Sequence, residues 1–149
     1  NNKGSLFMKE KPLFVIDFWN DAPYVGGCIA GRSYIHVNHK GDVEPCIFTQ
    51  FAVDNVKEKS LYDIMKSEFF QKLRAEQPYS NNTFLPCMWL DNPEYARDIC
   101  SNYAKPTYEG ADEMARDPEV QKALDEYAQK VNEIYGPLEK EIQGLETRP

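Results

Sequence analysis

The order of apolar and polar residues predicts a small sheet near the start of the chain. Residues 13–19 are apolar except for Asp17, as is typical of a buried strand. Residues 34–38 alternate, which places Ile35 and Val37 on one face of a second strand and polar side chains on the other. These two segments favour β-structure in the first third of the chain.

A hairpin is predicted where the second strand reverses. Residues 39–42 have the composition of a turn, and Gly41 can adopt the positive φ that such turns require. The return strand leads to Cys46, while Cys28 lies before the hairpin, directly after two glycines that allow a bend. Antiparallel pairing would therefore bring Cys28 and Cys46 together, although 17 residues separate them.

Apolar residues recur at helical spacing in three later segments. The first helix is expected to begin after Ser60 and to end at residues 77–78, where a loop follows. The second is expected at Pro93 with a cap at residues 91–92, and the third at residues 117–118. Their apolar stripes are Leu61, Ile64, Met65, Phe69 and Leu73; Tyr95, Ala96, Ile99, Cys100 and Tyr103; and Val120, Ala123, Leu124, Tyr127, Val131 and Ile134.

The pattern as a whole predicts an α+β fold, with a small antiparallel hairpin-centred sheet and packed helices. Residues 105–110 are expected to be a linker. The chain would then divide into residues 1–110 and a C-terminal amphipathic helical extension over residues 111–149. Residues 136–137, a glycine and a proline, are expected to break the third helix and leave a short charged helical tail.

Composition narrows the classes of function. Of the 149 residues, 42% are hydrophobic and 13% aromatic, enough to bury a core. The net charge of −7, without a basic cluster, argues against nucleic acid and against an anionic membrane as partners. No apolar run approaches the roughly 20 residues of a membrane-spanning helix, and no signal peptide is visible. We therefore expect a cytoplasmic protein.

The strongest candidates for a chemical role are the four cysteines: Cys28, Cys46, Cys87 and Cys100. In a reducing compartment, dispersed cysteines are more often metal ligands or core residues than disulfides. Iron–sulfur clusters need thiolates that converge from separate segments, usually four for each cluster. The hairpin would supply Cys28 and Cys46, and the loop after the first helix would supply Cys87.

The cysteines around the hairpin follow the pattern C-x12-G-x4-C, in which Gly41 is the glycine. This pattern, and above all residues 41–46 (GDVEPC), resembles the hairpin of SPASM and twitch domains, the auxiliary iron–sulfur domains of radical-SAM enzymes. Residues 17–21 (DFWND), 27–31 (GCIAG) and 86–87 (PC) are also similar to one branch of that family. The resemblance extends over about residues 12–110.

The resemblance implies an accessory role. A full SPASM domain has more cysteines and holds two clusters, whereas four cysteines bind at most one, so a twitch-like or truncated domain with one [4Fe–4S] cluster is implied. The chain lacks the CxxxCxxC motif of the SAM-binding cluster. In the family, that motif lies on a preceding α/β barrel, which would be the partner of this domain. Alone, the chain is not expected to cleave S-adenosyl-L-methionine.

The resemblance leaves the ligand set and the parent reaction open. The parent would be a radical-SAM oxidoreductase or maturase whose auxiliary cluster positions substrate or relays electrons, and its substrate is not readable here. Cys100 matches no family motif and lies on an apolar helix face, so it is either a fourth ligand or a core residue. If Cys100 is core, one iron would be open to substrate, solvent or another domain.

Other readings of the same residues remain. Zinc binds thiolates in tetrahedral sites, although no close C-x2-C pair occurs. The chain would then be a zinc-stabilised or metal-free interaction domain with the C-terminal helices as its binding surface. A chain purified in air can also lose a cluster.

Other side chains also have two interpretations. His36 and His39 are either additional ligands or solvated or hydrogen-bonded side chains, and Asp17 is either a buried functional carboxylate or a hydrogen-bonded one. Three aromatic residues near Cys87 either shield the cluster or form ordinary core: Tyr79, Phe84 and Trp89.

Overall fold

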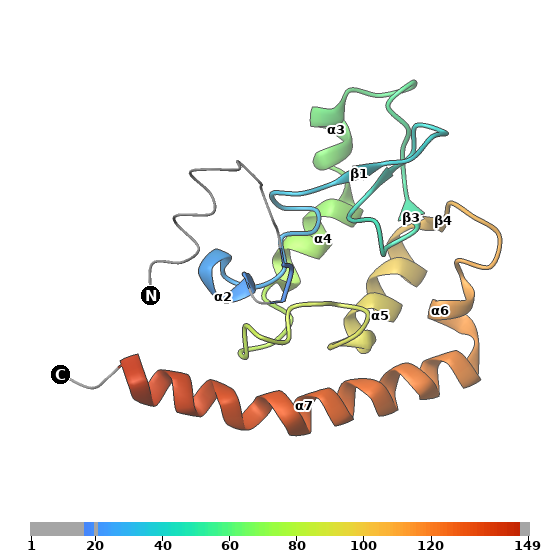
Figure 1. Ribbon diagram of the computed structural model, residues 1–149. Helices are drawn as coiled ribbons and strands as arrows, with labels where there is room; N and C mark the ends of the chain where they lie inside the picture. The colour runs from blue at the N-terminus through green and yellow to red at the C-terminus, as the bar shows by residue number, and fades with distance from the viewer. Residues whose placement is uncertain (1–16, 20, 147–149) are drawn as a thin grey trace, which may run out of the picture.

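A computed structural model of the chain describes residues 17–19 and 21–146, with side chains as far as residue 137. The elements, shown in Figure 1, are α2 (Ala22–Val25), β1 (His36–Val37), β2 (Val43–Glu44), β3 (Phe51–Ala52), α3 (Leu61–Met65), α4 (Glu68–Glu76), α5 (Pro93–Tyr103), β4 (Lys105–Pro106), α6 (Glu113–Arg116) and α7 (Pro118–Glu146). Two small antiparallel sheets combine with helices, which confirms the predicted α+β class. Among the described residues, no helix is both long and apolar enough to cross a membrane.

The predicted hairpin is present. β1 pairs with β2 in antiparallel register, with His36 opposite Glu44. Gly41 in the turn has a φ of 96°, as the turn chemistry predicted. A Cβ atom at this position would lie 2.6 Å from the side-chain oxygen of Asn55, so a larger residue would strain the backbone and also clash.

The polar side of the hairpin is buried. Glu44 is 1% exposed, and its carboxylate accepts hydrogen bonds from Asn38 Nδ2 at 3.0 Å and from the Thr107 hydroxyl at 2.6 Å. His36 Nδ1 lies 2.8 Å from the same carboxylate. By contrast, Val37 is 43% exposed. Glu44 thus joins the hairpin to the segment that follows α5, because a buried carboxylate must be hydrogen-bonded.

A second sheet occupies part of the expected linker. β3 pairs antiparallel with β4, so residues 105–106 form a strand rather than a free connection. Strands of two residues carry no periodic signal, and Pro106 fits an edge position because it has no N–H to donate. The expected strand over residues 13–19 falls largely outside the described residues, and Phe18 and Trp19 lie in a turn.

The first predicted helix is two helices. Ser60 caps α3 by accepting a hydrogen bond from the backbone N–H of Asp63 at 3.2 Å. Ser67 caps α4 in the same way through Phe70, at 3.5 Å. Serine competes with helical hydrogen bonding through its side chain, and the extended backbone at Ser67 interrupts the helix there. The predicted C-terminal end of this helical region, at residues 77–78, is confirmed, since α4 ends at Glu76.

Helix α5 begins at Pro93 as predicted and carries the centre of the core. Ile99 and Cys100 on this helix are both 0% exposed. The buried cluster joins α3, α4, α5 and α6 with one strand of each sheet and the loop between α4 and α5: Val43, Phe51, Ile64, Phe69, Phe70, Leu73, Tyr79, Met88, Trp89, Ala96, Ile99, Cys100 and Ala115. The core therefore lies directly behind the segments that carry the other three cysteines.

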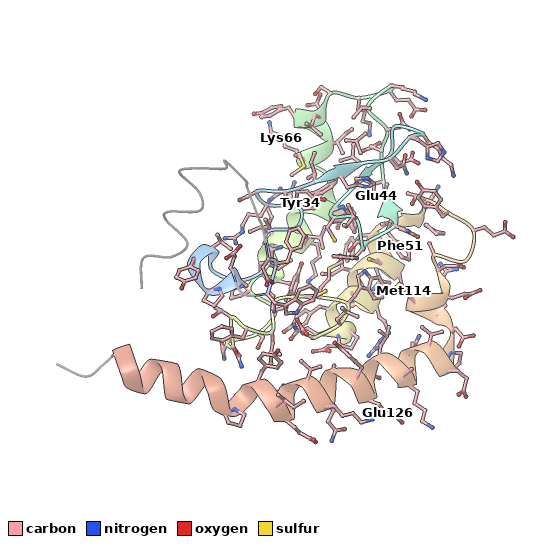
Figure 2. The ribbon with its side chains drawn as sticks, in the orientation of Figure 1. Tyr34, Glu44, Phe51, Lys66, Met114 and Glu126 are labelled. Atoms are coloured by element: carbon pink, nitrogen blue, oxygen red, sulfur yellow. The ribbon has the colours of Figure 1, made fainter. Side chains whose placement is uncertain are left out.

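Helix α7 is longer than predicted. The expected break at residues 136–137 is wrong, because α7 continues through Pro137 to Glu146. Gly136 has no Cβ to meet the proline ring, which removes part of the usual steric conflict. Figure 2 shows Met114 directed from α6 toward the body of the molecule and Glu126 directed away from it on α7. Much of the predicted apolar stripe is uncovered, and Ile134 is 63% exposed.

Candidate metal centre

Three loops bring Cys28, Cys46 and Cys87 to one cavity. Cys28 follows α2, Cys46 follows β2, and Cys87 precedes α5. All three side chains are half-buried. They line a single cavity of about 380 Å³, together with aromatic residues that include Phe18 and Tyr34, the latter labelled in Figure 2. The predicted convergence of these three thiols is therefore present.

Backbone hydrogen bonds place Cys28 beside the end of the hairpin. The N–H of Gly31 donates to the carbonyl of Pro45 at 3.1 Å, which ties the segment after Cys28 to the residue before Cys46. Gln77 Nε2 donates to the Ala30 carbonyl at 2.8 Å and so holds the same segment against the end of α4. These contacts explain how cysteines far apart in sequence reach one cavity.

Asp91 organises the third loop. Its carboxylate accepts a hydrogen bond from the backbone N–H of Cys87 at 2.8 Å and another from Trp19 Nε1 at 3.0 Å. Burial raises the pKa of the Asp91 carboxyl, and these two donors partly oppose the shift. Asn92 Nδ2 donates to the carbonyl of Cys87 at 3.1 Å. The predicted capping pair at residues 91–92 therefore serves the cysteine loop rather than the helix.

Burial disfavours the thiolate forms of two cavity cysteines, Cys28 and Cys87. Burial raises the pKa of Cys28 to about 11 and that of Cys87 to about 12. Hydrogen bonding from the backbone N–H of Ala30 opposes the shift at Cys28, and that from Trp89 and Leu90 opposes it at Cys87. A metal or cluster would have to displace these protons, because thiolates are the binding form.

Cys100 differs from the other three. It is 0% exposed, is part of the core cluster and does not line the cavity. Burial raises the pKa of its thiol, and charge on the Cys46 sulfur would raise it further. Among the described residues, no hydrogen bond to its sulfur is found.

The other candidate residues, His36, His39 and Asp17, lie outside the lining of the cavity. His36 is engaged with Glu44, and the Tyr108 hydroxyl lies 3.3 Å from His39 Nδ1, so neither histidine lines the cavity. Asp17 is exposed rather than buried, and its carboxylate accepts the N–H of Trp19 at 3.1 Å. No group of three or more His, Cys, Asp and Glu side chains among the described residues is arranged to hold a single metal ion.

None of the three aromatic residues expected near Cys87 lines the cavity. Tyr79 is buried in the core cluster, and burial raises the pKa of its hydroxyl; charge on Cys28, Cys100 and Cys46 would raise it further. Trp89 is buried behind Cys46 and belongs to the core cluster. Phe84 is half-buried. Tyr79 and Trp89 are therefore core residues in this structure.

Thr49 is a site residue that the sequence pattern did not single out. Its hydroxyl oxygen lies 3.3 Å from Cys46 Sγ and accepts a hydrogen bond from Trp89 Nε1 at 3.1 Å. The backbone turn from Cys46 to Thr49, closed by an N–H to carbonyl bond of 3.1 Å, brings this side chain back to the cysteine. A threonine three residues after the hairpin cysteine was the available signal.

Residues 28–89 match the family model of SPASM, described as an iron–sulfur cluster-binding domain. The match contains Cys28, Cys46 and Cys87 and ends before Cys100. It confirms the resemblance drawn from the hairpin pattern, and the matched residues include the three cysteines that line the cavity.

Two curated relatives are larger proteins that match part of this chain. The AdoMet-dependent heme synthase of Nitratidesulfovibrio vulgaris is 29% identical over 94 residues, which is 62% of this chain and 23% of that protein. The AdoMet-dependent heme synthase of Oleidesulfovibrio alaskensis is 32% identical over 54 residues, 36% of this chain and 14% of that protein. The matched part of the chain thus spans less than a quarter of either relative. No solved structure matches the chain.

Proposed function

We propose that this chain binds one [4Fe–4S] cluster through Cys28, Cys46 and Cys87, as the auxiliary domain of a radical-SAM oxidoreductase or maturase. The observation that carries the proposal is the single cavity lined by these three thiols within a SPASM domain. Thiolates are the usual ligands of iron–sulfur clusters. The protein would supply placement and tuning, while the redox chemistry belongs to the cluster.

The surroundings of the cavity support a cluster rather than a bare thiol pocket. The backbone N–H groups directed at Cys28 and Cys87 favour their thiolate forms, as cluster ligands require. The apolar and aromatic lining would limit water near the cluster, which influences its reduction potential. Three protein ligands would leave one iron open toward the cavity, where substrate could bind or electrons could enter.

The parent protein is part of the proposal. Both relatives are named for a reaction that depends on AdoMet and are several times longer than their match to this chain. A preceding radical-SAM barrel would then cleave S-adenosyl-L-methionine, and this domain would face the barrel with its cavity. Free thiols and an oxygen-sensitive cluster fit a cytoplasmic location.

Anaerobic reconstitution of the full chain with iron and sulfide tests the proposal. About four iron and four sulfide per chain, with the broad visible absorbance of a cluster, is the expected result. Cys46→Ala should lose the cluster, because it removes the ligand at the end of the hairpin. A chain that binds stoichiometric zinc at the same thiols and takes up no iron or sulfide would contradict the proposal. Full reconstitution of Cys46→Ala would contradict the ligand assignment.

A further inference from the structure

Thr49 is a fully buried threonine directly behind one of the three cavity thiols. It is 0% exposed, and its hydroxyl oxygen lies 3.3 Å from Cys46 Sγ. The turn between the two residues fixes the approach, since the N–H of Thr49 donates to the carbonyl of Cys46 at 3.1 Å. The side chain therefore meets the sulfur in an arrangement set by the backbone and closed to water.

The direction of the hydrogen bond between Thr49 and Cys46 follows from a second contact of the Thr49 hydroxyl, which is made with Trp89. Trp89 Nε1 lies 3.1 Å from the Thr49 oxygen, and an indole N–H can only donate. Thr49 accepts that bond and keeps one hydrogen of its own. Among the described residues, Cys46 Sγ is the acceptor found for this hydrogen. A cysteine bound to iron is a thiolate without a hydrogen, so Thr49 must be the donor in the loaded domain.

We infer that Thr49 is a positioning residue that donates a hydrogen bond to the Cys46 thiolate and raises the reduction potential of the cluster. The inference rests on the proposed function. Donation to a ligand sulfur stabilises the additional negative charge of the reduced cluster, and the effect is strong where water is excluded. Trp89 contributes by holding the hydroxyl in one orientation.

The arrangement at Cys46 differs from that at the other two thiols. Cys28 and Cys87 are served by backbone N–H groups, which no substitution removes directly. Cys46 is served by a side-chain hydroxyl. Thr49→Val keeps the shape of the side chain and removes the hydroxyl, which is both the donor to Cys46 and the acceptor for Trp89 Nε1, so the tuning can be tested at one side chain.

The test is the reduction potential of the reconstituted full chain, measured for the wild type, Thr49→Val and Thr49→Ser. We expect Thr49→Val to lower the potential by about 30 to 60 mV, a three- to tenfold change in the reduction equilibrium at 59 mV for each tenfold step. Thr49→Ser keeps the hydroxyl and should retain the wild-type potential. Thr107→Val is the matched control, because it removes a hydroxyl bonded to Glu44 and not to a thiol.

Thr49→Val leaves Trp89 Nε1 without its acceptor, and this loss can impair folding. A second pair of variants therefore tests the same donor with the tryptophan N–H removed. Trp89→Phe keeps the Thr49 hydroxyl, and Trp89→Phe with Thr49→Val removes both members. The double variant should have the lower potential of the two. Equal cluster content with equal potentials across these variants would overturn the proposed role of Thr49 and leave the proposed cluster binding intact. A wild-type chain that takes up no iron and sulfide would overturn both proposals.

Discussion

Cys28, Cys46 and Cys87 lie on loops at the wall of a cavity, whereas Cys100 lies on helix α5 inside the core. The three loop thiols have hydrogen-bond donors directed at sulfur. Cys100 has apolar neighbours and is part of the core cluster. The difference teaches that a cysteine count alone does not define a site: the surroundings of each sulfur separate three thiols that line a cavity from one that packs in the core.

Removal of one loop thiol should produce the largest effect. Cys28→Ala and Cys87→Ala each take away one of the three proposed protein ligands, and we expect the bound iron and sulfide to fall to background after anaerobic reconstitution. Each apo variant should still fold, since both side chains are only half-buried. Circular dichroism of the apo chains provides the control. A Cys87→Ala chain with full iron content would show that the cavity thiols are not equivalent.

The pH dependence of the apo chain sharpens the same comparison. The Cys28 and Cys87 thiols have an ordinary pKa of 9.0, raised in the fold to about 11 and about 12. Below pH 9 both the folded and the unfolded chain hold these protons, so the full free energy of unfolding is present. As the pH rises from 9 through 11 to 12, the unfolded chain ionises first and stability is lost.

Ultraviolet thiolate absorbance and denaturant unfolding together check this prediction. Absorbance of the folded chain should rise well above pH 9, whereas that of the unfolded chain should rise near pH 9. Cys28→Ala should remove one late-titrating thiol and reduce the loss of stability at high pH. If the folded and unfolded chains titrate together, the burial of these thiols is not the cause of any pH dependence.

Asp91 tests how the loop thiols are held in place. Asp91→Ala leaves the N–H of Cys87 and the indole N–H of Trp19 without their shared acceptor. We expect a loss of about 1.5–3 kcal/mol in the free energy of unfolding, the range for hydrogen bonds to a charged group. Urea unfolding of the apo chain measures it. Asp91→Asn keeps an acceptor oxygen and should lose less, and equal stability of both variants with the wild type would remove Asp91 from this role.

The parts of the molecule that the sequence predicted are those with local signals. Gly41 and the alternation before it predicted the hairpin, and Pro93 predicted the start of α5. The pairing of β3 with β4 depends on two-residue strands far apart in sequence, so no local pattern could reveal it. Ser67 resembled an ordinary helical residue, and its capping role depends on the extended backbone that interrupts the helix.

The site divides in the same way. Hairpin geometry and family resemblance together predicted that Cys28, Cys46 and Cys87 converge. Thr49 was missed because its importance comes from a turn that returns its side chain to Cys46 and from a tryptophan distant in sequence. Cys100 stayed undecided because a helical stripe places a buried ligand and a buried core residue at the same positions. Only the surroundings of its sulfur distinguish the two.

Cys100→Ala should produce the smallest effect and the sharpest contrast with the loop thiols. We expect full iron and sulfide content and a loss on the order of 1 kcal/mol in the free energy of unfolding, as when a methyl-sized group leaves a core. Cys100→Val adds apolar volume at a position with 0% exposure and should also keep the cluster while packing less well. Iron analysis and denaturant unfolding of the same preparations separate the two properties. If Cys100→Ala loses the cluster as Cys46→Ala is expected to do, Cys100 is a fourth ligand, and the division between loop and core thiols does not define the site.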